Sequence, residues 1–370
     1  MKFLMCCTLV PEKYEIEIRD ISNAANRFLT NLFRQMEKEH ILKILSYISL
    51  SVSNEIKENL RHEKEGNVVY FFKSKKIIGS VLYLLSYIWK ELRDCDYIVT
   101  YNVVYAWMLA PVLAKLRGKK SILILADYSP IESFIKKKQR VYARIQAYFM
   151  GKYDYVIGLS ENTERYLKTN QKFMCMEGGI SEEFYDYFSQ YRETKNEKVT
   201  LMYSGILEKV TGIEMLIDAF LECDDDNIQL NVTGEGSLAE WIKDVSKRDN
   251  RIHYYGCIPY DEYRKKLSEA DILINPRNMN LPENENNFPS KIMEYLATGK
   301  MVISTKFPGW KRYQKYITFC ESDSQSLQMT IEEWALSIKK RGEQEYFSNR
   351  EFARRFLWNE QVEAIINFLR

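Results

Sequence analysis

The stretch Phe288-Pro-Ser-Lys-Ile-Met-Glu-Tyr-Leu-Ala-Thr-Gly-Lys-Met-Val-Ile-Ser-Thr305 decides the fold of the second half of this chain. It follows an apolar run over 271–276, which predicts a buried strand, and a polar loop over 277–287. Its Pro favours the start of a helix over 290–298, and Gly299 stands just past the end of that helix. The apolar residues that follow predict the next strand. The pattern is a βαβ unit, and ligands bind such sheets beyond the carboxyl ends of their strands.

The helix carries two features that point to a nucleotide sugar. Its first amides, around Ser290 and Lys291, have no intrahelical partners and lie at the positive end of the helix dipole, where diphosphate oxygens bind. Glu294 lies one turn from Ser290 on the same face, so its carboxylate is placed to accept two hydrogen bonds from a ribose diol. The spacing leaves a second interpretation open, in which Glu294 is a solvated or capping carboxylate.

The segment Phe-Pro-Ser-Lys-x-x-Glu resembles the donor-site signature of the retaining glycosyltransferases of the GT-B fold, in the large family numbered four. In that family a Glu, seven residues and a second Glu span this loop and helix. Glu294 matches the second Glu, which holds the ribose, and Asn286 occupies the position of the first. An amide can still bond a sugar hydroxyl. The resemblance implies that Phe288, Ser290, Lys291 and Glu294 contact the donor.

The same resemblance implies an α/β fold with two Rossmann-like parallel-sheet domains facing across a cleft. It is strong over most of the second domain, and in the first domain it rests on the order of the elements. We expect an acceptor-side domain over 1–190, a linker over 191–198, a nucleotide-sugar-binding domain over 199–346, and a helical segment over 347–370 that packs back on the first domain.

The family also implies where the donor diphosphate lies. The apolar run 199–205 ends in Gly205, and in the family this glycine approaches the diphosphate, followed by an Arg and later a Lys that neutralise it. Ile206 and Thr211 occupy those two positions here. We therefore expect Lys209 or Lys291 to supply the positive charge.

Two more donor contacts are predicted with less support from the pattern. Gly234 opens a Gly-x-Gly turn after a strand, which alone is weak evidence for phosphate binding and lacks the full dinucleotide fingerprint. Ile258 ends another strand at the place where the resembled family makes main-chain contacts to the nucleobase.

The first half of the chain alternates strands and helices, as a doubly wound parallel sheet requires. Asn102 and Asp127 both stand where a strand gives way to a loop, the usual place for working residues. The family often has His-Asp at the second position, and this chain has Ala126-Asp127. We assign Asp127 either to orienting or deprotonating the acceptor hydroxyl or to capping the next turn. Asn23 and Asn26 are either acceptor contacts or a polar helix face.

Net charge is only +2, which favours neither nucleic acid nor a strongly acidic partner. Residues 71–150 nevertheless hold fourteen Lys and Arg against five acidic residues. Beside apolar helices, this surplus is suited to an anionic membrane surface or a lipid diphosphate, at about 1 kcal/mol per basic group near the lipid. A solvated basic face is the alternative. No helix-turn-helix or RNP-type signature indicates nucleic acid.

The seven cysteines and three histidines form no metal-spaced pair, so no metal site and no cofactor is expected beyond the donor co-substrate. The first apolar run, 3–10, predicts a strand in place of a signal peptide, and the run 77–89 is too short to cross a bilayer. We expect a cytoplasmic protein, peripheral at the inner face of the membrane.

Together these features predict a metal-independent, retaining transferase. It would move a sugar from a nucleoside-diphosphate sugar to a saccharide or a lipid-diphosphate-linked acceptor in cell-surface polysaccharide assembly. Two alternatives share the fold: a binding protein that has lost activity, and a nucleotide-sugar epimerase. A nicotinamide-dependent oxidoreductase is disfavoured, because no glycine occurs between Thr8 and Ala25.

Overall fold

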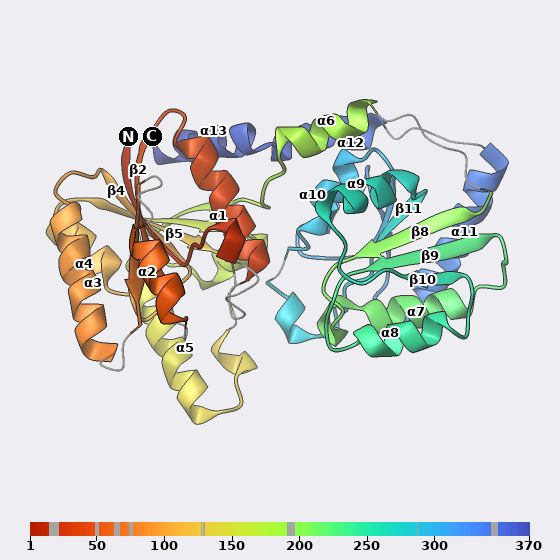
Figure 1. Ribbon diagram of the computed structural model, residues 1–370, viewed down its shortest axis with the longest axis horizontal. Helices are drawn as coiled ribbons and strands as arrows, with labels where there is room; N and C mark the ends of the chain where they lie inside the picture. Colours follow the sequence, from red (N-terminus) through yellow and green to blue (C-terminus); the bar gives the residue numbers. More distant parts are fainter. Residues whose placement is uncertain are drawn as a thin grey trace. The chain divides into compact units, whose positions relative to one another are not determined.

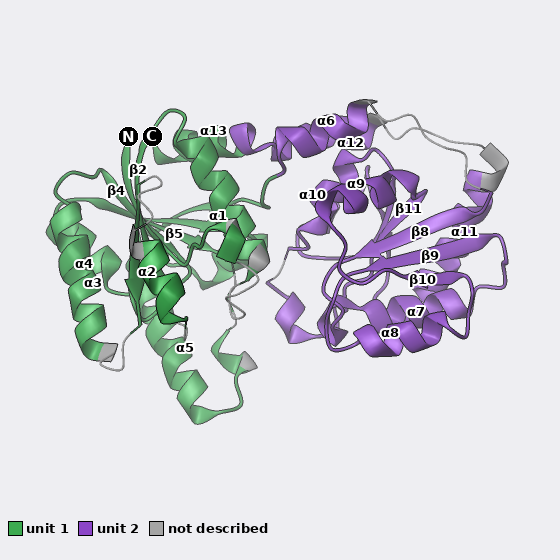
Figure 2. Ribbon diagram, in the orientation of Figure 1, with its two compact units in different colours: residues 1–179, 361–370 green, residues 180–360 purple. Residues whose placement is uncertain are grey.

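The computed structural model describes residues 1–14, 22–48, 52–62, 67–73, 77–126, 128, 130–190, 197–286, 288–341 and 347–370. The chain divides into two compact units, which Figure 2 shows in different colours. Unit 1 comprises Met1–Gly179 with Gln361–Arg370, and unit 2 comprises Ile180–Glu360. Asp127 and most of the expected linker, 191–196, lie outside the described residues.

Unit 1 is built on a parallel sheet with helices packed around it (Figure 1). Its strands are β1 (Lys2–Cys7), β2 (Ile41–Ile48), β3 (Val68–Phe72), β4 (Tyr97–Tyr101), β5 (Lys120–Leu125), β6 (Tyr155–Gly158) and β7 (Lys172–Cys175). They lie in the order β3-β2-β1-β4-β5-β6-β7. Because helices cover both faces of such a sheet, its central strands are almost continuously apolar; in β1 every residue after Lys2 is buried.

The helices of unit 1 follow from capping and spacing in the sequence. They are α1 (Asn23–Met36), α2 (Asn54–His62), α3 (Ile77–Glu91), α4 (Ala110–Leu116) and α5 (Lys137–Met150). Ser22 caps α1 as its position predicts, because its Oγ accepts a hydrogen bond from the Ala25 amide at 3.2 Å. None of the helices that the structure describes is long and apolar enough to span a membrane.

Unit 2 repeats the architecture with a smaller sheet. Its strands are β8 (Val199–Ser204), β9 (Ile228–Thr233), β10 (Ile252–Tyr254), β11 (Ile272–Asn275), β12 (Met301–Thr305) and β13 (Thr318–Cys320). Every pairing is parallel, in the order β10-β9-β8-β11-β12-β13. Its helices are α6 (Glu182–Gln190), α7 (Ile213–Leu221), α8 (Ala239–Ser246), α9 (Tyr260–Glu269), α10 (Lys291–Ala297), α11 (Ser324–Arg341) and α12 (Phe347–Ala353).

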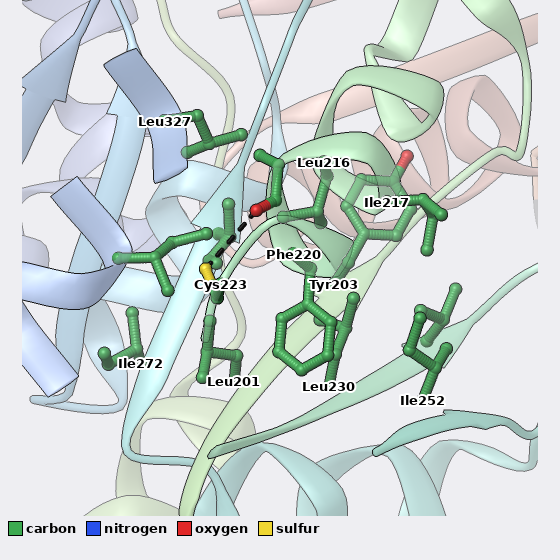
Figure 3. Packing of buried hydrophobic residues seen from close by; sticks show 14 of the residues in the cluster. Leu201, Tyr203, Leu216, Ile217, Phe220, Cys223, Leu230, Ile252, Ile272 and Leu327 are labelled. Atoms are coloured by element: carbon green, nitrogen blue, oxygen red, sulfur yellow. Dashed lines mark hydrogen bonds between the residues drawn. The ribbon is translucent and has the colours of Figure 1, made fainter. Parts of the chain in front are cut away.

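One face of the unit 2 sheet packs against α7 and α11 in a dense apolar core (Figure 3). Leu201 and Leu230 from the strands and Leu216 and Phe220 from α7 are fully buried there. The Cys223 thiol, at the end of α7, donates to the Ala219 carbonyl at 3.3 Å. This core holds the strand ends in fixed register, which positions the loops that follow them.

The unit boundary lies earlier than residue 190, and the last segment is divided. Helix α6 belongs to unit 2, because Phe184 and Phe188 pack into the core of that unit. The expected helical segment over 347–370 is divided by the 3-10 turn Arg354–Phe356, and α13 (Trp358–Leu369) follows that turn. The end of α13 lies on unit 1, where the Tyr97 hydroxyl bonds the Leu369 carbonyl at 3.2 Å.

Candidate functional site

The strand order of unit 2 marks one place on its sheet for a ligand. From β8 the chain moves outward through β9 to β10, then returns to the other side of β8 with β11. At such a reversal the loops after the two central strands diverge and open a crevice beyond the strand ends. Here the loops are those that begin at Gly205, after β8, and at Pro276, after β11.

Glycines allow the main chains of neighbouring loops to pack directly against each other at this edge. Gly212 has a φ of 77°, and a Cβ added there would lie 1.8 Å from the Pro276 carbonyl oxygen. At Gly234 the φ is 133°, and an added Cβ would lie 1.8 Å from the Gly205 carbonyl oxygen. No side chain fits at either position. The sequence predicted Gly205 and Gly234 as donor contacts, and the structure shows that they pack the loops together.

The amides of these two glycines are already used. The Gly205 amide donates to the Thr233 carbonyl at 3.2 Å, and the Gly234 amide donates to the Gly256 carbonyl at 2.9 Å. Neither amide is therefore available to a phosphate in this conformation, and other groups at the edge must meet the charge of a bound diphosphate.

Glu294 is held by one carboxylate oxygen. Its Oε2 accepts from the Tyr263 hydroxyl at 2.5 Å and from Lys291 Nζ at 2.8 Å. Its Oε1 makes no hydrogen bond within the described part of the chain, and the side chain is 29% exposed. Burial and the neighbouring Glu294 charge raise the pKa of Tyr263 well above its ordinary value, so the phenol stays protonated and donates. The carboxylate is thus oriented, with one oxygen open to a diol.

Lys291 orients the Glu294 carboxylate in this structure, and its predicted contact with the donor stays a prediction. Its Nζ bonds Glu294 Oε2 and lies 3.2 Å from the Tyr263 hydroxyl, so its charge is committed to holding the carboxylate. Lys209 is exposed in the 3-10 turn Lys209–Thr211 and has no ion pair among the described residues. Ser290 is exposed at the start of α10 and makes no capping bond with its side chain.

Phe288 and Ile258 lie against the core of unit 2. The Phe288 ring is buried, with its centroid 5.3 Å from that of Phe307 and 5.9 Å from that of Tyr313. Because the ring is buried, a donor contact at Phe288 would involve its main chain, and that contact stays a prediction. Ile258 lies in the loop after β10 and is half-buried against the same core.

Asn286 is a buried amide without a hydrogen bond to any residue that the structure describes. Its side chain is 5% exposed, and its Oδ1 and Nδ2 are both buried. A buried polar group left unpaired costs about 1–3 kcal/mol, so proteins pair nearly all of them. The position that matches the first Glu of the resembled signature therefore holds an amide that is free to bond a ligand.

Arg277 is a residue of this edge that the sequence reasoning missed. It comes directly after Pro276, at the carboxyl end of β11, and its Nη1 donates to Asn284 Oδ1 at 2.6 Å. Burial lowers the pKa of its guanidinium. The signal available in the sequence was its place after a buried strand in the unit's βαβ segment.

At the carboxyl edge of the unit 1 sheet, two of the predicted acceptor-side residues, Asn26 and Asn102, bond main-chain groups of unit 1. Asn26 is buried, with Oδ1 accepting from the Val10 amide and Nδ2 donating to the Val10 carbonyl, each at 2.9 Å. This corrects its interpretation as an acceptor contact. Asn102 has a left-handed φ of 56°, and its Oδ1 accepts from the Ala126 amide at 2.9 Å, next to Asp127. The side chain of Asn23 is outside the described part.

The basic region of unit 1 includes helix α5, which presents exposed apolar side chains at helical spacing. Val141, Ile145 and Tyr148 are 47%, 40% and 57% exposed. Arg140 and Arg144 are exposed on the same helix. Within the described residues no group of three or more His, Cys, Asp or Glu is arranged to hold a metal ion.

The chain is similar to known proteins in sequence over part of its length and in fold over all of it. Residues 198–335 match the family model described as glycosyl transferases group 1. Over its whole length the chain superposes on 99% of Anabaena HepE, solved in complex with UDP, with a TM-score of 0.73 and 14% sequence identity. No curated protein sequence matches the chain.

The chain has the GT-B fold. Two further GT-B structures match its full length. Sucrose-phosphate synthase from Thermosynechococcus elongatus aligns over 98% of its chain with a TM-score of 0.72 and 13% identity. The lipopolysaccharide outer core galactosyltransferase WaaB aligns over 99% with a TM-score of 0.68 and 14% identity. HepE was also solved with UDP-glucose. The group 1 match covers the unit 2 sheet and helix α10, which contains Glu294.

Proposed function

We propose that this GT-B protein is a glycosyltransferase that uses a nucleoside-diphosphate sugar as donor. The observation that carries the proposal is the state of Glu294. Its Oε2 is fixed by Tyr263 and Lys291, and its Oε1 is open at the ligand edge of the sheet. A carboxylate held in this way is suited to accept hydrogen bonds from the two hydroxyls of a ribose. The group 1 family match and the UDP complexes of HepE support the same donor class.

In the proposed reaction the bond between the anomeric carbon and the diphosphate oxygen breaks, and a bond to the acceptor oxygen forms on the same face of the sugar. The acceptor proton passes to the departing diphosphate, so configuration is retained without a covalent enzyme intermediate. The charge of the leaving group would be met by cations of the chain, including Lys209, and no metal ion is required. Asn286 would bond a hydroxyl of the transferred sugar, and Asp127 would orient the acceptor hydroxyl while its proton passes to the diphosphate.

The acceptor is proposed to be a saccharide or a lipid-diphosphate-linked saccharide in polysaccharide assembly at the inner face of a membrane. The apolar residues of α5, with the basic residues beside them, support a membrane-facing role, because such helices lie in the headgroup region of anionic bilayers. Flotation with phosphatidylglycerol vesicles should carry the protein upward. Vesicles of phosphatidylcholine, or the exchange Ile145→Ser, should reduce that fraction. Equal flotation in all cases would remove the membrane from the proposal.

The donor is tested by thermal-shift titration with UDP, GDP, dTDP and ADP. One of them, at one hundred times its dissociation constant, should add about 2.7 kcal/mol to the free energy of unfolding. The matching sugar nucleotides are then assayed for transfer with saccharide acceptors, with and without EDTA. Turnover of the sugar nucleotide with no acceptor present would indicate an epimerase, and binding without turnover would indicate a binding protein.

A further inference from the structure

We propose that Arg277 is the cation that binds the diphosphate of the donor, with Asn284 as the residue that positions it. The inference rests on the proposed function and assigns a role that the resembled family gives to positions occupied here by Ile206 and Thr211.

The main chain places Arg277 at the strand reversal of unit 2. It follows Pro276, whose carbonyl lies against Gly212, so the loop after β11 contacts the loop after β8. The Arg277 carbonyl accepts a hydrogen bond from Thr305 Oγ1 at 2.7 Å, which anchors it to the end of β12. Burial raises the pKa of Tyr203, near the end of β8, to about 12, and the charge of Arg277 partly offsets that rise. The guanidinium therefore lies near the carboxyl ends of the central strands.

The guanidinium of Arg277 makes few hydrogen bonds with the described residues. Of its five N–H donors, one is bonded, from Nη1 to Asn284. Its Nε is buried without a hydrogen bond, and Arg277 has no ion pair among the described residues. The Arg277 side chain is half-buried, so a bound anion would reach its open N–H donors and would supply the counterion that the described residues do not provide.

Two other arginines of unit 2 show the usual arrangement. Arg251 pairs with both oxygens of Asp249 and donates to the Cys223 carbonyl at 2.7 Å. Arg264 pairs with Glu183 and with Asp261. The side chains of Arg251 and Arg264 are each 12% exposed, and each has a carboxylate partner. Arg277 differs from both, because its one bonded partner is a neutral amide.

Asn284 fixes the direction of Arg277. It is fully buried, and its Nδ2 donates to the Val210 carbonyl at 2.8 Å and to the Asn278 carbonyl at 2.7 Å. Its Oδ1 is thereby turned toward Arg277 and holds one arm of the fork. The amide also ties Arg277 to the turn that carries the exposed Lys209.

An independent observation in the same loop points to a ligand. Asn286, two residues after Asn284, is 5% exposed and has both amide atoms unpaired. Among the described residues, this short loop thus holds a cation without a carboxylate partner and an amide without a hydrogen bond, which suit a ligand with anionic oxygens and hydroxyl groups. A sugar diphosphate offers both, and the planar fork of Arg277 matches the paired oxygens of a phosphate.

The test is calorimetric titration of the wild type, Arg277→Gln and Arg277→Lys with UDP, GDP, dTDP, ADP and inorganic pyrophosphate. For the diphosphate that binds the wild type, Arg277→Gln should weaken affinity about 10- to 100-fold, and Arg277→Lys by a smaller factor. Affinity for the corresponding nucleoside should not change. Arg251→Gln removes a guanidinium at the opposite end of the same sheet and should leave diphosphate affinity unchanged.

The outcomes separate this inference from the proposed function. A nucleoside diphosphate that binds Arg277→Gln or Arg277→Lys as tightly as the wild type overturns the role of Arg277 and leaves the proposed function standing. Pyrophosphate binding that depends on Arg277, with no nucleoside diphosphate bound, supports the anion site and overturns the donor class. Failure of the wild type to bind any of the five probes overturns both. If Arg277→Gln does not fold, the comparison of the wild type with Arg277→Lys decides.

Discussion

The carboxyl edges of the two parallel sheets use polar residues in opposite ways. In unit 1, Asn26 bonds the main chain of Val10, and Ser46 Oγ accepts from the Leu9 amide at 3.0 Å. In unit 2, by contrast, Asn286 has no partner and Glu294 Oε1 is open within the described residues. In the same topology, some polar residues fix loops through hydrogen bonds, and others keep atoms that can bond a ligand. Among the described residues the unit 1 edge also has one buried hydroxyl without a hydrogen bond, Ser160 Oγ after β6. The open carboxylate oxygen together with the unpaired amide, more than strand order, distinguishes the edge that we assign to the donor.

The largest effect should come from Glu294→Gln, which removes the charge of the open carboxylate. With the cognate sugar nucleotide, kcat/KM should fall about 100-fold, because two charge-assisted hydrogen bonds to the ribose are weakened. The free energy of unfolding should change by less than about 1 kcal/mol, since the ion pair with Lys291 is partly exposed. Steady-state kinetics and urea unfolding measure the two quantities. A variant with wild-type kcat/KM would remove the basis for assigning the donor to unit 2.

A second substitution tests whether the unit 2 edge depends on direct packing between the main chains of its loops. Gly212→Ala should lower the free energy of unfolding by about 2–4 kcal/mol, from a left-handed φ and a Cβ that displaces the Pro276 carbonyl. Gly118→Ala in unit 1 is the matched control, because Gly118 has a φ of 66° and nothing within 4 Å of an added Cβ. It should cost only the backbone strain, about 1–2 kcal/mol. If both variants lost the same free energy of unfolding, the loops of unit 2 would be able to move and make room for the added Cβ.

Asn26→Ala tests the other side of the comparison. It deletes two buried hydrogen bonds to Val10 and should destabilise the protein by about 1–3 kcal/mol, measured by urea unfolding. Nucleoside-diphosphate affinity should stay at the wild-type value, because Asn26 holds a loop of unit 1. A folded Asn26→Ala variant with normal stability and impaired transfer would instead give Asn26 an acceptor role.

The smallest effect concerns pH. Burial, with the charges of Lys266 and Lys198, lowers the pKa of His253 on β10. The folded state therefore favours neutral His253, and the unfolded chain binds the proton more readily between the two pKa values. Stability from this group is present above the unfolded pKa, about 6.5, and falls as the pH drops below it. The thermal midpoint should decrease slightly less from pH 7.5 to pH 5.5 in His253→Gln than in the wild type, and an identical decrease would contradict this assignment.

The sequence predicted most of the fold because parallel strands buried on both faces are continuous apolar runs, and helices alternate with them. Helix α10 also ends as its pattern indicates, since Gly299 has a φ of 73°. The break before α13 was missed, because residues 351–369 keep an apolar spacing that does not show the 3-10 turn at Arg354–Phe356.

Site residues were predictable where a local pattern decides their position. Glu294 lies in the first turn of α10, as its spacing predicted, and its contact with the donor stays a prediction. The burial of Phe288 depends on Phe307 and Tyr313, which are distant in sequence, so no local pattern reveals it. No local pattern distinguishes Arg277 from Lys209 or Lys291, because its lack of a carboxylate partner among the described residues is visible only in three dimensions.

Amide hydrogen exchange with and without the nucleoside diphosphate that binds most tightly is the most direct test of the central claim, that the carboxyl edge of the unit 2 sheet binds the donor. Binding slows exchange wherever a ligand orders the backbone. We predict slower exchange in residues 205–212, 276–286 and 288–294, with no change in residues 247–251 at the opposite end of the sheet. Protection confined to residues 247–251, or to the strand ends of unit 1 near Asn102, would contradict the assignment.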